Sequence, residues 1–261
     1  MSTPIVPAPS PSPAGQTLAG PPRTPGAFGA LYRLVLRHQL NRGRLFLFGA
    51  ITALCVVLGW VIGRASDDRA QDAVDTVSAL GLGLIVPVVA LVLGSAALGT
   101  WVDDETLVYV WLRPVRRWVV AVAATLAAVS VAVPVTVVAL SILAALGSGG
   151  DADAIAGTAI GAAFGGVAYT AVFVALGLLI RRALLWGLIY VFIWEFFVAR
   201  AGDGASRLSI NSYAASLLSD LSGIEIRLAD RAAVTSYIVL TTITVVATAF
   251  TTWRLQRANV A

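Results

Sequence analysis

The stretch that decides the fold is residues 155–199, IAGTAIGAAFGGVAYTAVFVALGLLIRRALLWGLIYVFIWEFFVA. Its only basic residues are the adjacent Arg181 and Arg182, and its only acidic residue is Glu195. A membrane-crossing helix needs roughly 20 apolar residues, so one helix of this length would be more than twice as long as the bilayer core. Two antiparallel spans, 155–180 and 183–199, with the arginine pair at a tight turn, therefore fit better. The second span is short and contains a carboxylate, so a partly inserted segment is the competing interpretation.

Four further apolar runs extend this pattern to both sides. They are residues 45–63, 77–102, 119–146 and 233–252. The whole chain is 58% hydrophobic and 12% charged, with a mean hydropathy of +0.86, whereas soluble domains carry about 25% charged residues. We therefore expect an all-α membrane protein with six transmembrane helices in a single domain over residues 27–261.

The chain before the first span has two parts. Residues 1–26 hold eight of the eleven prolines, and proline has no N–H and a fixed φ, so we expect a disordered, proline-rich cytosolic tail. In residues 27–44, Arg33, Arg37 and Arg44 fall on one helical face. This pattern is typical of an amphipathic helix in the membrane interface with arginines reaching lipid phosphates. The alternative is a cytosolic extension of the first span.

The basic residues predict the orientation. All 18 are arginine. With the N-terminus inside, eleven arginines lie near cytosolic span ends and six lie in outer loops. Cytosolic loops are the arginine-rich ones, so we expect a multi-pass protein with both termini cytosolic. The absence of lysine is typical of a GC-rich bacterial genome, so the expected location is a bacterial plasma membrane.

Several functional classes are excluded or disfavoured by what the sequence lacks. Without lysine there is no P-loop. With one cysteine, Cys55, and one histidine, His38, there is no intrachain disulfide and no cysteine cage or multi-histidine metal site. No Ser-His-Asp set or paired carboxylates occur. We expect no catalytic residues, no metal and no cofactor in this chain, and no nucleic-acid partner. ATP hydrolysis, if any, is expected on a separate subunit.

The segment 103–118, DDETLVYVWLRPVRRW, joins the second and third predicted spans. Leu107 and Trp111 lie four residues apart, on one face of a helix, and Pro114 ends that helix because its ring clashes with a further turn. A short helix that docks in a groove on a soluble partner is one interpretation. The other is a solvated loop in which three acidic residues pair with three arginines.

This loop resembles the one between the second and third spans of type-2 ABC exporter permeases, which often read E-x-x-x-G-T-L-x-Y-L-L-x-R-P-V-x-R. The matching residues are Glu105, Thr106, Leu107, Tyr109, Arg113, Pro114, Val115 and Arg117. The glycine before the threonine is missing here. The layout, with an interfacial helix, six spans and a long outer loop before the sixth, is also similar.

The resemblance implies a permease that dimerises with itself or a related permease and binds two separate ATPase subunits, which carry ATP and magnesium. It also implies that the loop is the coupling helix. The candidate coupling residues are Glu105, Leu107, Trp111, Arg113, Arg116 and Arg117.

Glu195 is the only acidic residue in a predicted span, and a charge at membrane depth is a candidate functional group. It lies four residues from the predicted outer end of its span, roughly 6 Å of rise. There it would reach the outer interface or pair with Arg200 or Arg207. A structural or gating role and direct contact with a cargo both remain open.

Two other patterns concern packing. Gly157, Gly161 and Gly165 form overlapping GxxxG patterns, which let helices approach closely, either within the bundle or at a dimer seam. In the outer loop 200–232, an apolar helical stripe over residues 210–221 predicts a short helix on or in the outer leaflet. That helix acts as an extracellular gate or simply covers the bundle.

Three functions are compatible with these features. The first is the membrane subunit of an ATP-driven ABC exporter, which forms the translocation path. The second is a secondary transporter driven by an ion gradient, which needs intramembrane charges or broken helices at the midplane. The third is a membrane sensor or assembly protein that does not transport. The cargo is not readable from the sequence.

Overall fold

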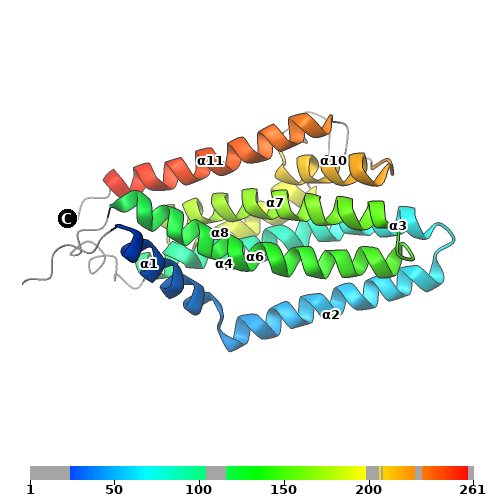
Figure 1. Cartoon of the computed structure of the whole chain (residues 1–261), viewed down its shortest axis with the longest axis horizontal. Helices are drawn as coiled ribbons and strands as arrows, with labels where there is room; N and C mark the ends of the chain where they lie inside the picture. The colour runs from blue at the N-terminus through cyan, green and yellow to red at the C-terminus, as the bar shows by residue number, and fades with distance from the viewer. Residues whose placement is uncertain (1–23, 104–115, 198–205, 207, 227–230, 258–261) are drawn as a thin grey trace, which may run out of the picture.

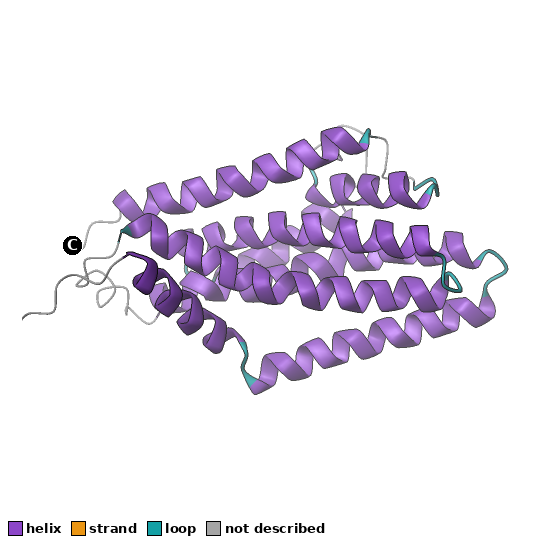
Figure 2. Ribbon diagram, viewed as in Figure 1, coloured by secondary structure: helices purple, strands orange, loops and turns teal. Residues whose placement is uncertain are grey.

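The computed structural model describes residues 24–103, 116–197, 206, 208–226 and 231–257. All regular structure in these ranges is helical (Figure 2). Five apolar helices among the described residues are long enough to cross a membrane. They are Arg42–Ala65, Arg69–Gly99, Arg117–Gly147, Ala152–Leu179 and Ala233–Arg257. The chain is therefore an all-α, multi-pass integral membrane protein.

The labelled elements divide these helices as follows. Helix α2 is Arg42–Ala65, and the second long helix consists of α3 (Arg69–Thr76), the π-helical η1 (Val77–Ile85) and α4 (Val86–Asp103). Helix α6 is Arg117–Gly147, α7 is Ala152–Leu179 and α11 is Ala233–Arg257. Each begins within eight residues of the run predicted from the sequence.

Five of the six predicted spans are helices of membrane length among the described residues, and the remaining one is shorter. The predicted span 183–199 appears as α8 (Ala183–Ile189) followed by the π-helical η2 (Tyr190–Phe197). Helix α8 has 7 residues and η2 has 8. A helix of that length is shorter than a bilayer core. Its second half carries Glu195, whose carboxylate is bound by a different helix, α10 (Ile210–Ser222).

Helix α7 lies at the centre of the bundle. It packs against α4, α6, α10 and α11. In the 18-residue apolar stretch of α7, 61% is buried. In the 18-residue apolar stretches of α2 and α11, only 17% and 11% are buried. These two helices therefore form the outside of the bundle. Figure 1 shows them as its lower and upper edges.

Helix α1 (Thr24–Gln39) is separate from the first long helix. The chain breaks at Asn41, which has extended backbone angles. Val35 of α1 is buried, and the hydroxyl of Tyr32 donates to Ser130 Oγ of α6 at 3.0 Å. The alternative of a simple extension of the first span is therefore wrong, and Arg42 and Arg44 belong to α2 rather than to the amphipathic helix.

The two ends of the bundle differ in what they hold. Helix α1, the start of α6 and the end of α11 lie at one end, whereas α10 and the connections α2–α3 and α6–α7 lie toward the other (Figure 1). We call these the α1 end and the α10 end. Helix α7 finishes at the α1 end and α11 starts toward the α10 end. The chain therefore passes from the α1 end to the α10 end between Leu179 and Ala233.

Candidate functional site at Glu195

The Glu195 side chain is completely buried and accepts three hydrogen bonds from residues that the structure describes. Its Oε2 accepts from the Ser209 hydroxyl at 2.5 Å. Its Oε1 accepts from the backbone N–H of Ile210 at 3.2 Å and from the Tyr190 hydroxyl at 3.1 Å. A carboxylate is an acceptor with two oxygens and about four lone-pair sites, so these donors satisfy most of its capacity inside the bundle.

The π-helical winding of η2 brings Tyr190 and Glu195 together. These residues are five apart in the sequence, and in an α-helix they would point to different sides of the axis. A π-helix closes i→i+5 hydrogen bonds, so residues five apart come nearly one above the other. The local backbone therefore positions the phenol to donate to the carboxylate.

The other two donors come from the first turn of α10. Ser209 is its N-cap, with extended backbone angles, and the Ser209 hydroxyl oxygen accepts from Ser212 N at 3.3 Å. Gly223, with φ +66°, ends the helix. Helix N-termini favour negative charge because the first N–H groups have no intrahelical partner. Glu195 therefore caps α10 from a distant part of the chain and joins η2 to it.

Three glycines of α7 set the position of α10. A Cβ added to Gly157 would lie 2.9 Å from Leu218 O, and one added to Gly161 would lie 2.9 Å from Ala214 O. A Cβ on Gly165 would lie 3.1 Å from the Ala214 side chain. The glycine stripe therefore packs internally against α10, whose first turn lies beyond Gly165, just past the middle of α7.

Glu195 consequently lies in the middle of the bundle. The completely buried Tyr169 of α7 interacts electrostatically with it. At 1.5 Å of rise per residue, Tyr169 is about 25 Å from the start of α7 and about 15 Å from its end. The Glu195 side chain is buried against the start of α10, and its expected reach to the outer interface stays a prediction. The expected partners Arg200 and Arg207 lie outside the described residues.

One polar side chain beside the carboxylate, that of Asn211, lacks a partner among the described residues. In the part of the chain that the structure describes, no hydrogen-bond partner is found for either amide atom of Asn211. Asn211 is completely buried. A buried polar group without a partner costs about 1–3 kcal/mol. The cluster can therefore bind a water molecule or a small polar group that supplies the missing hydrogen bonds.

A cation that the sequence did not single out also contacts the first turn of α10. Arg231 Nη1 donates to Ser212 Oγ at 2.9 Å, and Nη2 donates to Ser206 Oγ at 3.1 Å. Its guanidinium lies 4.7 Å from the centroid of the Tyr213 ring. Arg231 entered the sequence argument only as one of the outer-loop arginines, and no local motif distinguishes it from the others.

The predicted coupling residues are only partly described. Glu105, Leu107, Trp111 and Arg113 lie outside the described residues. Arg116 is exposed and directly precedes α6. Arg117 Nη1 donates to Leu255 O at 2.6 Å and to Gln256 O at 2.9 Å, so it satisfies carbonyl groups at the end of α11.

Within the described ranges, no group of three or more His, Cys, Asp or Glu residues is placed to hold a metal ion. Comparison with family models and with curated proteins finds no match for this chain. The fold and the site thus establish a multi-pass integral membrane protein in which a buried carboxylate joins two short helices.

Proposed function

We propose that this chain is the permease subunit of an ATP-driven exporter of the type-2 ABC class. It forms the translocation path and couples to a separate ATPase subunit. The observation that carries the proposal is the joint between η2 and α10 at Glu195, because intramembrane ionisable residues mark transport paths and gates. The resemblance of the 103–118 loop to the coupling loop of these permeases supports the ATP-driven class.

In this proposal, the α8–η2 segment and α10 are two halves of the fifth crossing. The change of ends between Leu179 and Ala233 supports this interpretation. With five long helices and this divided one, the chain crosses six times. The α1 end and both termini are then cytosolic, α1 lies in the inner interface, and the membrane is the bacterial plasma membrane.

The hydrogen-bonded joint is suited to a gate. Apolar helix packing has no directional bonds to exchange, whereas the Ser209 and Ile210 donors can leave Glu195 for water or for a polar group of the cargo. The neighbouring Asn211 amide, which lacks a partner, is available to the same group. Movement of α10 away from η2 would open a polar path from the middle of the bundle toward the α10 end.

The coupling to ATP hydrolysis takes place at the α1 end. Asp103 and Arg116 of the 103–118 loop lie there, next to the α6–α11 contact made by Arg117. A partner ATPase that binds ATP and magnesium pushes on this loop, and α6 transmits the displacement to α7 and α10. A pair of permease chains, identical or related, forms the complete exporter.

A second candidate function is favoured by the same joint. Secondary transporters bind substrate where discontinuous helices meet at the midplane, and η2 and α10 meet there. The two functions differ in their energy source. The ATP-driven class has the additional support of the loop sequence.

The energy source is tested with inside-out vesicles from cells that produce the chain with its genomic neighbours, using a panel of amphipathic fluorescent probes. The proposal predicts accumulation that needs ATP, stops with vanadate and continues with a protonophore. Glu195→Leu should abolish it. Accumulation driven by an imposed pH gradient without ATP would instead establish a secondary transporter.

A further inference from the structure

An apolar groove of about 430 Å³ lies between α7 and α11. Its walls include Val172, Leu176 and Leu179 of α7 and Thr242, Val246 and Phe250 of α11. Its volume is within the range of small-molecule sites, roughly 300–1,000 Å³. Because α11 is an outer helix, the groove faces the bilayer rather than the interior of the bundle.

The threonine that lines the groove does not make its surface polar. Thr242 is the one residue with a polar side chain among those that line this groove, and its hydroxyl donates to Ile238 O at 2.7 Å. A hydroxyl that bonds to the carbonyl four residues earlier is satisfied within its own helix. The groove therefore offers its occupant methyl and methylene groups but no free hydrogen-bonding group, as a hydrocarbon chain requires.

The groove occupies the leaflet on the α1 side. From Val172 to Leu179 the rise of α7 is about 10 Å, and half of a bilayer core is about 15 Å. Leu179 is the last residue of α7. A chain in the groove therefore runs from the α1-end boundary of the membrane toward its middle.

Cationic and aromatic side chains stand at the mouth of the groove. Trp253, Arg254 and Arg257 follow Phe250 by three, four and seven residues and share its helical face. The Phe250 and Trp253 rings stack with centroids 5.7 Å apart, and the Arg257 guanidinium lies 4.3 Å from the Trp253 centroid. All three mouth residues are exposed. The exposed Arg181 and Arg182 follow the end of the other wall.

From this arrangement, we infer that the α7–α11 groove binds an anionic phospholipid. One acyl chain lies in the groove, and the phosphate is held by Arg254 and Arg257, with Arg181 and Arg182 at the opposite edge. Phosphate and arginine charges are complementary, and a tryptophan at headgroup level is the usual interfacial anchor. Which leaflet supplies the lipid rests on the proposed orientation, whereas binding itself does not.

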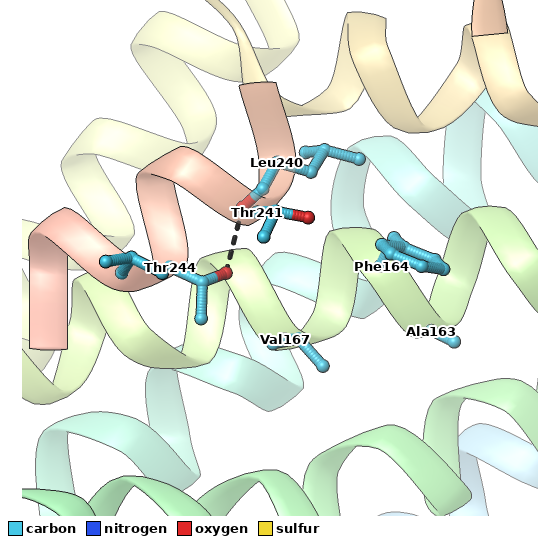
Figure 3. A pocket seen from close by; sticks show the side chains of 7 residues that line it. Ala163, Phe164, Val167, Leu240, Thr241 and Thr244 are labelled. Atoms are coloured by element: carbon cyan, nitrogen blue, oxygen red, sulfur yellow. Dashed lines mark hydrogen bonds between the residues drawn. The ribbon is translucent and has the colours of Figure 1, made fainter. Parts of the chain in front are cut away.

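A second groove provides an internal control. It lies on the other side of α11, has a volume of about 190 Å³, and is lined by Ala163, Phe164, Val167, Leu240, Thr241, Thr244 and Val245 (Figure 3). Its α7 wall begins near the middle of that helix, away from the arginines at the α1 end. It is equally apolar but has no charged mouth. Thr241 and Val245 of this second groove are the same residue types, on the same helix, as Thr242 and Val246 of the first groove. They lie on the opposite face of α11 and serve as matched control positions.

The inference is tested with the full chain in detergent by native mass spectrometry, titrating dioleoylphosphatidylglycerol and dioleoylphosphatidylcholine. An arginine near an anionic headgroup contributes about 1 kcal/mol, or about five-fold in affinity. With two arginines at the headgroup, we expect dioleoylphosphatidylglycerol to bind the first site about 25-fold more tightly than dioleoylphosphatidylcholine. The double substitution Arg254→Gln with Arg257→Gln should remove that preference. No ATPase is needed, so the result is independent of the proposed transport function.

Groove-filling variants locate the acyl chain. Thr242 and Val246 are exposed, so Thr242→Phe or Val246→Phe fills the groove without disturbing the α7–α11 contact. Each should weaken binding of both lipids at least ten-fold, whereas Thr241→Phe and Val245→Phe should not. Equal affinities of the two lipids would overturn the inference. Equal effects of the groove variants at Thr242 and Val246 and of the control variants at Thr241 and Val245 would also overturn it. Release of a dimer by Thr242→Phe would show instead that a second copy covers the groove.

Discussion

Substitution of Glu195 by leucine tests whether this carboxylate holds α10 in place. Leucine is apolar and of similar size, but it accepts no hydrogen bond. The donors of Ser209 and Ile210 are then left unpaired in a completely buried place. Each unsatisfied buried donor costs about 1–3 kcal/mol, so closing the joint becomes less favourable by about 2–6 kcal/mol. Removal of a charge from the membrane interior offsets part of this cost. We therefore expect closing of the joint to become less favourable by about 2 kcal/mol.

The assay measures opening of α10 rather than unfolding of the protein. Cys55 is the only cysteine and is buried, so it is replaced by alanine and a single cysteine is placed at Ala215, a completely buried position of α10. Local opening limits how fast a maleimide reagent reaches it. A shift of 2 kcal/mol corresponds to labelling about 30-fold faster.

Two further substitutions make the result specific. Glu195→Gln keeps a carbonyl oxygen for Ile210 N but loses the charge, and it should accelerate labelling about five-fold. Tyr190→Phe removes one donor from a carboxylate that keeps two, and it should have the smallest effect. If Glu195→Leu labels Ala215→Cys at the parental rate while melting temperatures are unchanged, the carboxylate does not hold α10, and the gating proposal fails.

Four other outcomes are expected. A cysteine at Gly150 should react with an impermeant reagent added outside whole cells; reaction only after lysis would reverse the orientation. Gly161→Val places a methyl-bearing Cβ against the backbone of α10, so it should destabilise the α7–α10 contact by about 1–3 kcal/mol, read as faster labelling of α10; unchanged labelling would contradict the close approach. Arg117→Gln should lower the melting temperature by a few degrees because α11 loses charged hydrogen bonds at its last carbonyls; an unchanged melting temperature would show that these bonds contribute nothing. Trp111→Ala should weaken ATPase binding more than Arg116→Ala does, since a buried aromatic anchor contributes about 2 kcal/mol or more and a solvated arginine about 0–1; equal retention of the ATPase would show that the loop is not the coupling element.

The long helices could be predicted from the sequence because the bilayer imposes a strong length requirement. The run 119–146 became α6, Arg117–Gly147, and the run 155–180 became α7, Ala152–Leu179. The apolar stripe over residues 210–221 likewise indicated α10 within one residue at its C-terminal end. In each case the signal is local, since hydropathy or helical periodicity within one segment suffices.

The site could not be predicted because its contacts are not local. The Glu195–Ser209 bond joins residues 14 apart, and the Tyr190–Glu195 bond needs π-helical winding, which hydropathy does not encode. Ser212 and Ser216 lie outside the apolar stripe that predicted α10, yet both are buried. The Ser216 hydroxyl donates to Ser212 O at 2.8 Å, so the helix satisfies its own serine and can pack against the glycines of α7.

The most direct test of the account is purification of the tagged full chain from its own cells in mild detergent. The account predicts that a separate subunit with a Walker A motif co-purifies with it. It also predicts that the complex hydrolyses ATP in a vanadate-sensitive way, at a rate that Glu195→Leu changes without releasing the subunit. A chain that purifies without any ATPase, and whose vesicles move probes on a proton gradient alone, would contradict it.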